Sequence, residues 1–297
     1  MFLPALALIG ALGIAAGLSP LVGTETPWEM RRTSDARRTG TFQHPLLTES
    51  SGVAASRRQP GILWTLNDSG NDSWIFATDT LGRDLGAFKV TGAENRDWEA
   101  ISLGPCGARE CLYLADTGDN GESLESVRIY RIPEPAVPAR GSRTARAEAL
   151  EFRYPKGSRD VEAAFVTADG SVHLITKGWR TPRTYRIDPE AWDSDQTATA
   201  RATGTLPIDT RSLGNRVTDA ALAPSGDRVA VRTYLAIYLF TLTPDGRLVP
   251  LGVACDAAGL QFQGEGISWL DEREMVLTSE GGFGIPGTIV VLGCGSG

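Results

Sequence analysis

Five short segments of the chain place an oxygen-bearing side chain before a small residue and then an aliphatic residue at the start of a strand-like run. These segments begin at Ser51, Glu99, Glu162, Asp219 and Glu265, and successive segments lie 46 to 63 residues apart. Hydroxyl and carboxylate oxygens are the ligands of calcium, which takes about six to eight oxygen donors. If the five positions, called anchors here, meet in space, they form a candidate calcium site.

Three further carboxylates, Glu49, Asp97 and Asp160, stand two residues before an anchor, on the same face of an extended strand. Carboxylates gathered in one narrow place repel one another, so either their pKa values rise or a cation neutralises them. The alternative to calcium is an acidic, water-filled channel whose carboxylates accept hydrogen bonds from backbone amides. The chain has two histidines and no C-x-x-C motif, which argues against zinc or copper.

The same succession of strands and turns follows each anchor, and this repetition predicts the fold. Second strands are expected at 62–66, 111–115, 172–176, 228–231 and 274–278, and a third strand follows each. Fourth strands are expected at 84–90, 149–154, 202–208 and 248–254. Four strands per unit at this period are typical of a β-propeller blade.

The last unit lacks a fourth strand because the chain ends at Gly297, whereas Thr39–Phe42 resembles a fourth-strand segment, Thr203–Leu206. We therefore expect an all-β fold, a single β-propeller over residues 39–297 with five four-stranded blades, the last closed by the N-terminal strand. Closing the ring removes exposed strand edges. The alternative is six blades, with the additional blade inside the long interval 99–162.

The N-terminal segment carries no charge over residues 2–23, which is long enough to cross a bilayer. We expect residues 1–23 to be a signal peptide or a retained membrane anchor, and 24–38 to be a linker. A buried helix of the folded domain is a third possibility. Contact with a membrane is expected only if residues 2–23 are retained.

The four cysteines permit three pairings. Cys106 and Cys111 flank a turn between two strand-like runs, where a local disulfide forms easily, and Cys255 and Cys294 could then form the second. Four unpaired buried cysteines are the alternative. Disulfides would indicate an extracytoplasmic location, secreted or periplasmic.

The far end of each second strand returns to the face on which the anchors lie, because the two strands are antiparallel. Loops at this channel mouth contain two carboxylates, Asp68 and Asp116, that could position a water molecule for catalysis. Candidate ligand-binding residues there are Asn67, Asp119, Asn120, Lys177, Arg180, Arg232 and Glu280. The same Asp, Asn and Gly clusters are also ordinary turn formers.

The segments Ser51-Gly52-Val53, Glu265-Gly266-Ile267 and Asp97-Trp98-Glu99-Ala100-Ile101 resemble strand openings of calcium-dependent apyrases, and more broadly of secreted phytase-like and esterase-like propellers. The resemblance covers residues 40–292. It implies five blades, an axial calcium and hydrolysis of nucleoside di- and triphosphates. It further implies that Asp68 is functional and that the calcium ligands are among Ser51, Asp97 or Glu99, Glu162 and Glu265. The chain departs from the pattern in having no arginine beside Asp68, and Asp219 in place of serine.

Composition narrows the function classes. The net charge of −7 and pI near 5.0 argue against nucleic-acid binding, and the absence of Gly-x-Ser-x-Gly argues against a serine hydrolase. We predict an exported, calcium-stabilised monomer that binds a small polar or anionic ligand, or a protein partner, at the channel mouth. The alternative is an apyrase-like or phytase-like calcium-dependent phosphoester hydrolase, so the sequence leaves open whether the protein is an enzyme.

Overall fold

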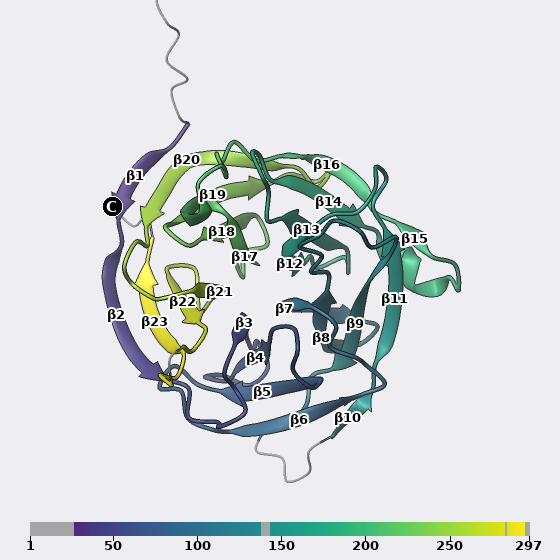
Figure 1. The fold of residues 1–297 in the computed structure, drawn as a ribbon, viewed down its shortest axis with the longest axis horizontal. Coiled ribbons are helices and arrows are strands. Elements are labelled where there is room, and N and C mark those ends of the chain that lie inside the picture. Colours follow the sequence, from purple (N-terminus) through teal and green to yellow (C-terminus); the bar gives the residue numbers. More distant parts are fainter. Residues whose placement is uncertain (1–26, 138–142, 283, 295–297) are drawn as a thin grey trace, which may run out of the picture.

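Five β-sheets are arranged as a ring around a central axis in the computed structural model, which describes residues 27–137, 143–282 and 284–294 (Figure 1). The predicted all-β, five-bladed propeller is confirmed. Each blade is an antiparallel sheet whose first strand lies nearest the axis, and these inner strands contact one another in the order β3, β7, β12, β17, β21 and back to β3. The anchors therefore surround one channel.

The blades follow one another along the chain. Blade 1 contains β3 (Ser50–Ala55), β4 (Leu63–Asn67), β5 (Trp74–Thr78) and β6 (Gly86–Thr91). Blade 2 contains β7 (Trp98–Cys106), β8 (Arg109–Asp116), β9 (Val127–Pro133) and β11 (Glu148–Arg153). Blade 3 contains β12 (Val161–Val166), β13 (Val172–Thr176), β14 (Arg183–Ile187) and β16 (Arg201–Thr205). Blade 4 contains β17 (Val217–Leu222), β18 (Arg228–Thr233), β19 (Ala236–Leu242) and β20 (Leu248–Asp256).

The fifth blade is closed by the N-terminal strand, as predicted. It contains β21 (Gly264–Trp269), β22 (Glu274–Ser279) and β23 (Thr288–Gly293), and β2 (Ser34–Thr41) pairs antiparallel with β23. Figure 1 shows this strand in purple along the outside of the yellow last blade. The two ends of the described chain are thus joined by backbone hydrogen bonds, and no sheet edge is left at the seam.

Three outer strands were not predicted. β1 (Glu29–Arg32), β10 (Arg143–Arg146) and β15 (Ala198–Thr199) add in parallel to the outer strands β20, β6 and β11. Residues 29–38, expected to be part of a linker over 24–38, instead form β1, which pairs with β20 of blade 4, and most of β2, which pairs with β23 of blade 5. Residues 1–23 lie outside the described part of the chain.

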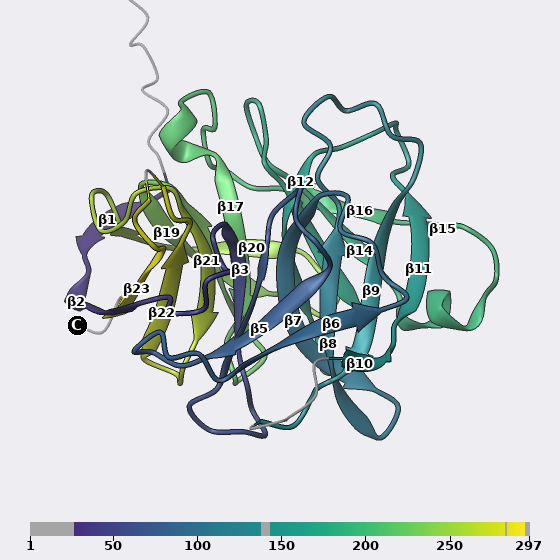
Figure 2. The same cartoon turned by 60° about the horizontal axis from the view of Figure 1, so that its bottom comes forward.

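The long interval 99–162 does not form a sixth blade among the described residues. Its additional length is used by a long hairpin of β7 and β8 and by β10, which crosses to the edge of blade 1. Strands cross the thickness of the disk, so their connecting loops collect on two faces (Figure 2).

The hydrophobic core is divided into five clusters, each packed between two neighbouring blades. Between blades 1 and 2, for example, Trp64 and Trp98 are fully buried against Leu112 and Leu114. The blades are thus held together by apolar burial, and their inner ends are free to carry polar groups. Helix is limited to two short 3₁₀ turns, Pro189–Asp193 and Leu213–Asn215, and the described residues contain no helix with the length and apolar character needed to span a membrane.

Both predicted disulfides are present, Cys106–Cys111 and Cys255–Cys294. The first closes the β7–β8 hairpin. The second joins β20 of blade 4 to the residue after β23 of blade 5, and both of its cysteines are buried. Two disulfides are typical of a protein that folds in an oxidising compartment.

We expect the double variant Cys255→Ala/Cys294→Ala to lose about 3–4 kcal/mol of unfolding free energy, because its disulfide closes a loop with a sequence separation of 39. The matched variant Cys106→Ala/Cys111→Ala should lose about 2 kcal/mol or less, because its loop separation is only 5. Urea denaturation under oxidising conditions measures both. Equal losses would contradict the loop-length argument.

Candidate functional site

A β-bulge places four of the five predicted anchors at the axis. In every inner strand the pairing with the second strand shifts register at one point, and the skipped residues include Ser51, Glu99, Glu162 and Glu265. A bulge interrupts the ladder and re-aims the residue it leaves unpaired. Four of the five short anchor motifs therefore contain the residue that a bulge leaves unpaired.

In blade 4 the bulge skips Thr218 rather than Asp219, so the fourth anchor was predicted one residue too late. The Thr218 hydroxyl donates to the backbone carbonyl of Glu265 at 3.0 Å, as the Ser51 hydroxyl does to that of Glu99 at 3.1 Å. Asp219 points to the other face of the strand, because neighbouring residues alternate. Its carboxylate accepts hydrogen bonds from the backbone amides of Ala220 and Ile267, both at 2.8 Å. Asp219 thus matches the alternative of a carboxylate bound to a neighbouring blade.

Small residues beside the anchors allow the inner strands to approach closely. A Cβ on Gly52 would lie 3.0 Å from the amide nitrogen of Ile101, and one on Gly266 would lie 2.8 Å from the amide nitrogen of Val53. These two close approaches between inner strands, called the waist here, lie directly after the anchors Ser51 and Glu265 along the strands.

One carboxylate cluster at the mouth combines Asp68, Asp97 and Glu99, whose oxygen atoms lie within 4.8 Å of one another. Glu99 is 5% exposed and also accepts the Ser51 hydroxyl at 3.3 Å. A Cβ at Gly118 would lie 2.3 Å from carboxylate oxygens of both Asp97 and Glu99, so a side chain there would displace these carboxylates. Asp68 and Asp97 are only half-buried, so this cluster faces the solvent side of the mouth.

A second cluster shares Glu99 and adds Asp160 and Glu162, again with oxygens within 4.8 Å. Here a lysine already supplies positive charge, because Lys177 Nζ lies 2.5 Å from Glu162 Oε1 and 3.8 Å from Asp160 Oδ2. These carboxylates and Glu99 raise the pKa of Lys177 despite its burial, so the ammonium stays charged. Lys177 neutralises only part of the two clusters.

Glu265 and Glu280 continue the acidic lining on the blade 5 side. Glu265 Oε1 accepts a hydrogen bond from the Tyr234 hydroxyl at 3.0 Å, and Glu280 Oε2 accepts one from the side-chain amide of Gln263 at 2.6 Å. Burial, with repulsion from Asp68 and, for Glu280, from Glu265 also, raises the pKa of each to about 7.

The remaining axial carboxylates are perturbed for the same reasons. Burial and repulsion from Asp68 raise the pKa of Asp97 to about 6. Burial and repulsion from Glu162 raise the pKa of Glu99 well above its ordinary value. Burial raises the pKa of Glu162 to about 8, with Lys177 opposing the shift. Each ionised carboxylate at the mouth therefore destabilises the others.

Three predicted mouth residues support the loops instead of facing the channel. Asp116 accepts the amides of Arg96 and Asp97, so it fixes the approach to the first cluster. Asn67 is buried, and its side-chain oxygen accepts the amides of Thr48 and Glu49. Asp119 accepts the amides of Ser123 and Leu124.

Arg232, predicted at the mouth, is instead 1% exposed between blades 4 and 5. It donates to the carbonyls of Gly266 and Thr278 at 2.6 and 2.8 Å, which leaves it no path to the mouth. Arg180 and Asn120 are exposed, Arg180 in a cleft with Trp179 and Asn120 in one with Asp97.

Sequence reasoning missed Thr218 and Tyr234, and it listed Asp160 only as a second layer. Tyr234 could have been found by comparing blades, because it directly follows the second strand β18 as Lys177 directly follows the second strand β13. Thr218 stands immediately before Asp219 in the fourth motif, where a hydroxyl matches Ser51.

The donor set of the first cluster fits a hard divalent cation. Asp68, Asp97 and Glu99 supply only carboxylate oxygens, which suit calcium or magnesium better than softer metals. Among the described residues, no lysine forms an ion pair with Asp68, Asp97 or Glu99. In the second cluster, Lys177 pairs with both Asp160 and Glu162.

No protein-family model matches the chain, and no curated protein matches it. Solved structures are similar at low identity. The PQQ-bound aldose sugar dehydrogenase of Streptomyces coelicolor is 14% identical, with 86% of this chain and 96% of that chain covered and a TM-score of 0.49. A gluconolactonase of Xanthomonas campestris is 12% identical, with 89% and 99% covered and a TM-score of 0.49. Virginiamycin B lyase of Staphylococcus aureus is 14% identical, with 85% and 69% covered and a TM-score of 0.41. Similarities at this level indicate no activity for this chain, and the resemblance to apyrases and phytases stays a prediction.

Proposed function

We propose that this protein is an extracytoplasmic propeller that binds calcium at its channel mouth and uses the bound ion to hold a small anionic ligand. The observation that carries the proposal is the cluster of Asp68, Asp97 and Glu99, whose oxygens lie within 4.8 Å of one another. Calcium would supply the positive charge that neutralises these carboxylates, and it would offer an open coordination position to an anion. The two disulfides support the location.

The chain's own residues would define the site around that ion. Lys177 places a second positive charge beside Glu162, so an anion at the mouth would meet two cations in an otherwise acidic channel. Asp116 would hold the loop that presents Asp97, and Gly118 would leave the space above Asp97 and Glu99 open.

We expect calcium to raise the melting temperature by about 5–10 °C at a hundredfold excess over its dissociation constant, because it binds only the folded chain. Differential scanning fluorimetry in calcium, in magnesium and in chelator measures this. The Lys177→Met variant should retain calcium binding but lose the calcium-dependent binding of small anions. Failure of calcium to change the melting temperature would contradict the proposal.

A calcium-dependent phosphoester hydrolase is the second candidate, favoured by the position of Asp68. This carboxylate belongs to the first cluster yet is half-buried, so it can contact both an ion and a water molecule. Phosphate release from nucleotide and phytate panels, with calcium and with chelator, tests the activity. Turnover that depends on calcium and falls in Asp68→Asn would support it, whereas calcium binding without turnover would leave ligand binding alone.

A further inference from the structure

The half of the channel beyond the waist contains a cavity of about 380 Å³. It is formed by the inner strands two to four residues after their anchors, so it opens on the face opposite the carboxylates. Its walls come from β3, β7, β17 and β21 and from the loop after β3. This volume lies within the range of small-molecule sites, about 300–1,000 Å³.

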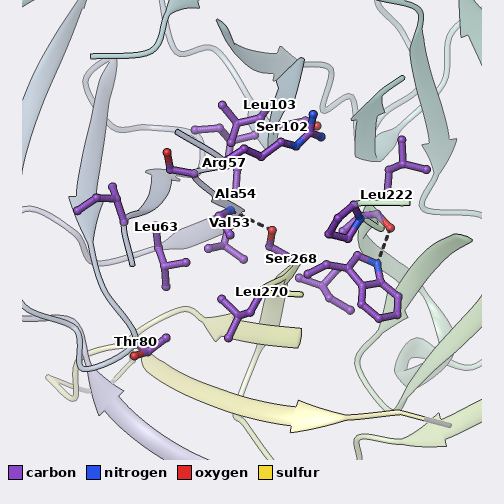
Figure 3. A pocket seen from close by; sticks show the side chains of 18 of the residues that line it. Val53, Ala54, Arg57, Leu63, Thr80, Ser102, Leu103, Leu222, Ser268 and Leu270 are labelled. Atoms are coloured by element: carbon purple, nitrogen blue, oxygen red, sulfur yellow. Dashed lines mark hydrogen bonds between the residues drawn. The ribbon is translucent and has the colours of Figure 1, made fainter. Parts of the chain in front are cut away.

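Aliphatic residues make up more than half of the lining of this cavity, and polar atoms form much of the rest of its surface. Figure 3 shows Val53, Leu63, Leu103, Leu222 and Leu270 around it. An apolar ligand would be taken out of water against these side chains, and burial of apolar surface is the main driving force for such binding. The carboxylates of the mouth lie on the other side of the waist and are not part of this lining.

Polar groups occur at a few positions of the same cavity. Arg57, Ser102 and Ser268 are among the lining residues, and the Ser268 hydroxyl accepts a hydrogen bond from the backbone amide of Ala55 at 3.0 Å (Figure 3). The Arg57 side chain is 48% exposed and has one ion pair, in which Nη1 lies 3.3 Å from Glu110 Oε1. A guanidinium has five N–H donors, so further donors remain for a ligand.

We propose that this cavity binds a small amphipathic carboxylate, with its apolar body against the aliphatic walls and its carboxylate on Arg57. An arginine holds a carboxylate through charge-assisted hydrogen bonds in a planar arrangement. The combination of an apolar interior with one cation at its edge fits a single anionic head on an apolar chain. This site is independent of the calcium proposed at the mouth.

Octanoate, octanol and octylammonium are suitable probes, and isothermal titration calorimetry of the full chain measures their binding. We expect one octanoate per chain, bound about tenfold more tightly than octanol, with octylammonium weaker still. Arg57→Gln should remove the tenfold advantage and leave octanol binding unchanged. Arg58→Gln is the matched control, since its exposed side chain is outside the lining.

Two further variants separate the cavity from the mouth. Ser102→Phe should fill the cavity and abolish binding of octanoate and octanol, whereas Glu99→Gln should bind octanoate normally with or without calcium. Absence of octanoate binding, equal binding of octanoate and octylammonium, or unchanged octanoate affinity in Arg57→Gln would each overturn the proposal. Because Arg57 is half-exposed, its variant tests the site even if Ser102→Phe does not fold.

Discussion

Replacement of Glu99 by glutamine is expected to weaken calcium binding about a hundredfold and, at the same time, to stabilise the calcium-free protein. Glu99 is shared by both carboxylate clusters, so its charge contributes to every cation position at the mouth. In the absence of a cation that charge is buried beside Glu162, Asp68 and Asp97, and its pKa is raised well above the ordinary value. Glutamine keeps the shape and removes the repulsion, so we expect a gain of about 1–3 kcal/mol at pH 8.

Glu94→Gln is the matched control for this pair of effects. Glu94 is exposed. Its backbone carbonyl oxygen, which the substitution does not change, accepts a hydrogen bond from the ring N–H of Trp98. Titration calorimetry with calcium and urea denaturation in chelator should therefore show no change in this variant. If Glu99→Gln destabilised the calcium-free protein, the carboxylate would have a supporting role in the fold that outweighs the repulsion.

The repeated blades and their closure could be predicted from the sequence because both depend on local signals. Alternating strands, turn residues and the bulge motifs recur every 46 to 63 residues, and four residues, Thr39–Phe42, suffice to show the resemblance to a fourth strand. The outer strands β1, β10 and β15 have no such signal. Arg143–Arg146 is a short polar segment, and it is a strand only because blade 1 offers it an open edge.

The positions of the anchors, though not those of all the mouth residues, could be predicted to within one residue. Four of the five anchors lie at the bulges, but Thr218 and Asp219 are both polar, so the motif alone could not show which one the bulge leaves unpaired. A shift of one residue reverses the face of a strand. Tyr234, directly after β18, reaches the mouth, whereas Arg232, within the strand, is buried between blades.

The calcium-free protein is expected to become more stable as the pH falls from 8 to 5.5. Burial raises the pKa of Asp97 to about 6 and those of Glu265 and Glu280 to about 7, so the folded state holds these protons more tightly than the unfolded state does. Their ionisation therefore removes stability as the pH rises through about 6 to 7, and protonation restores it on the way down.

Calcium should reverse this dependence, because the ion replaces the protons and favours the ionised carboxylates. We expect the melting temperature in chelator to rise by about 5 °C between pH 8 and pH 5.5, and the additional stabilisation by saturating calcium at pH 8 to shrink over the same range. Glu280→Gln, which removes a half-buried carboxylate that neither cluster contains, should flatten the curve in chelator without weakening calcium. The contradicting result would be a melting temperature in chelator that falls as the pH is lowered to 5.5. It would show that ionisation of these carboxylates does not destabilise the folded protein, and their repulsion would then no longer be a reason to expect a cation at the mouth.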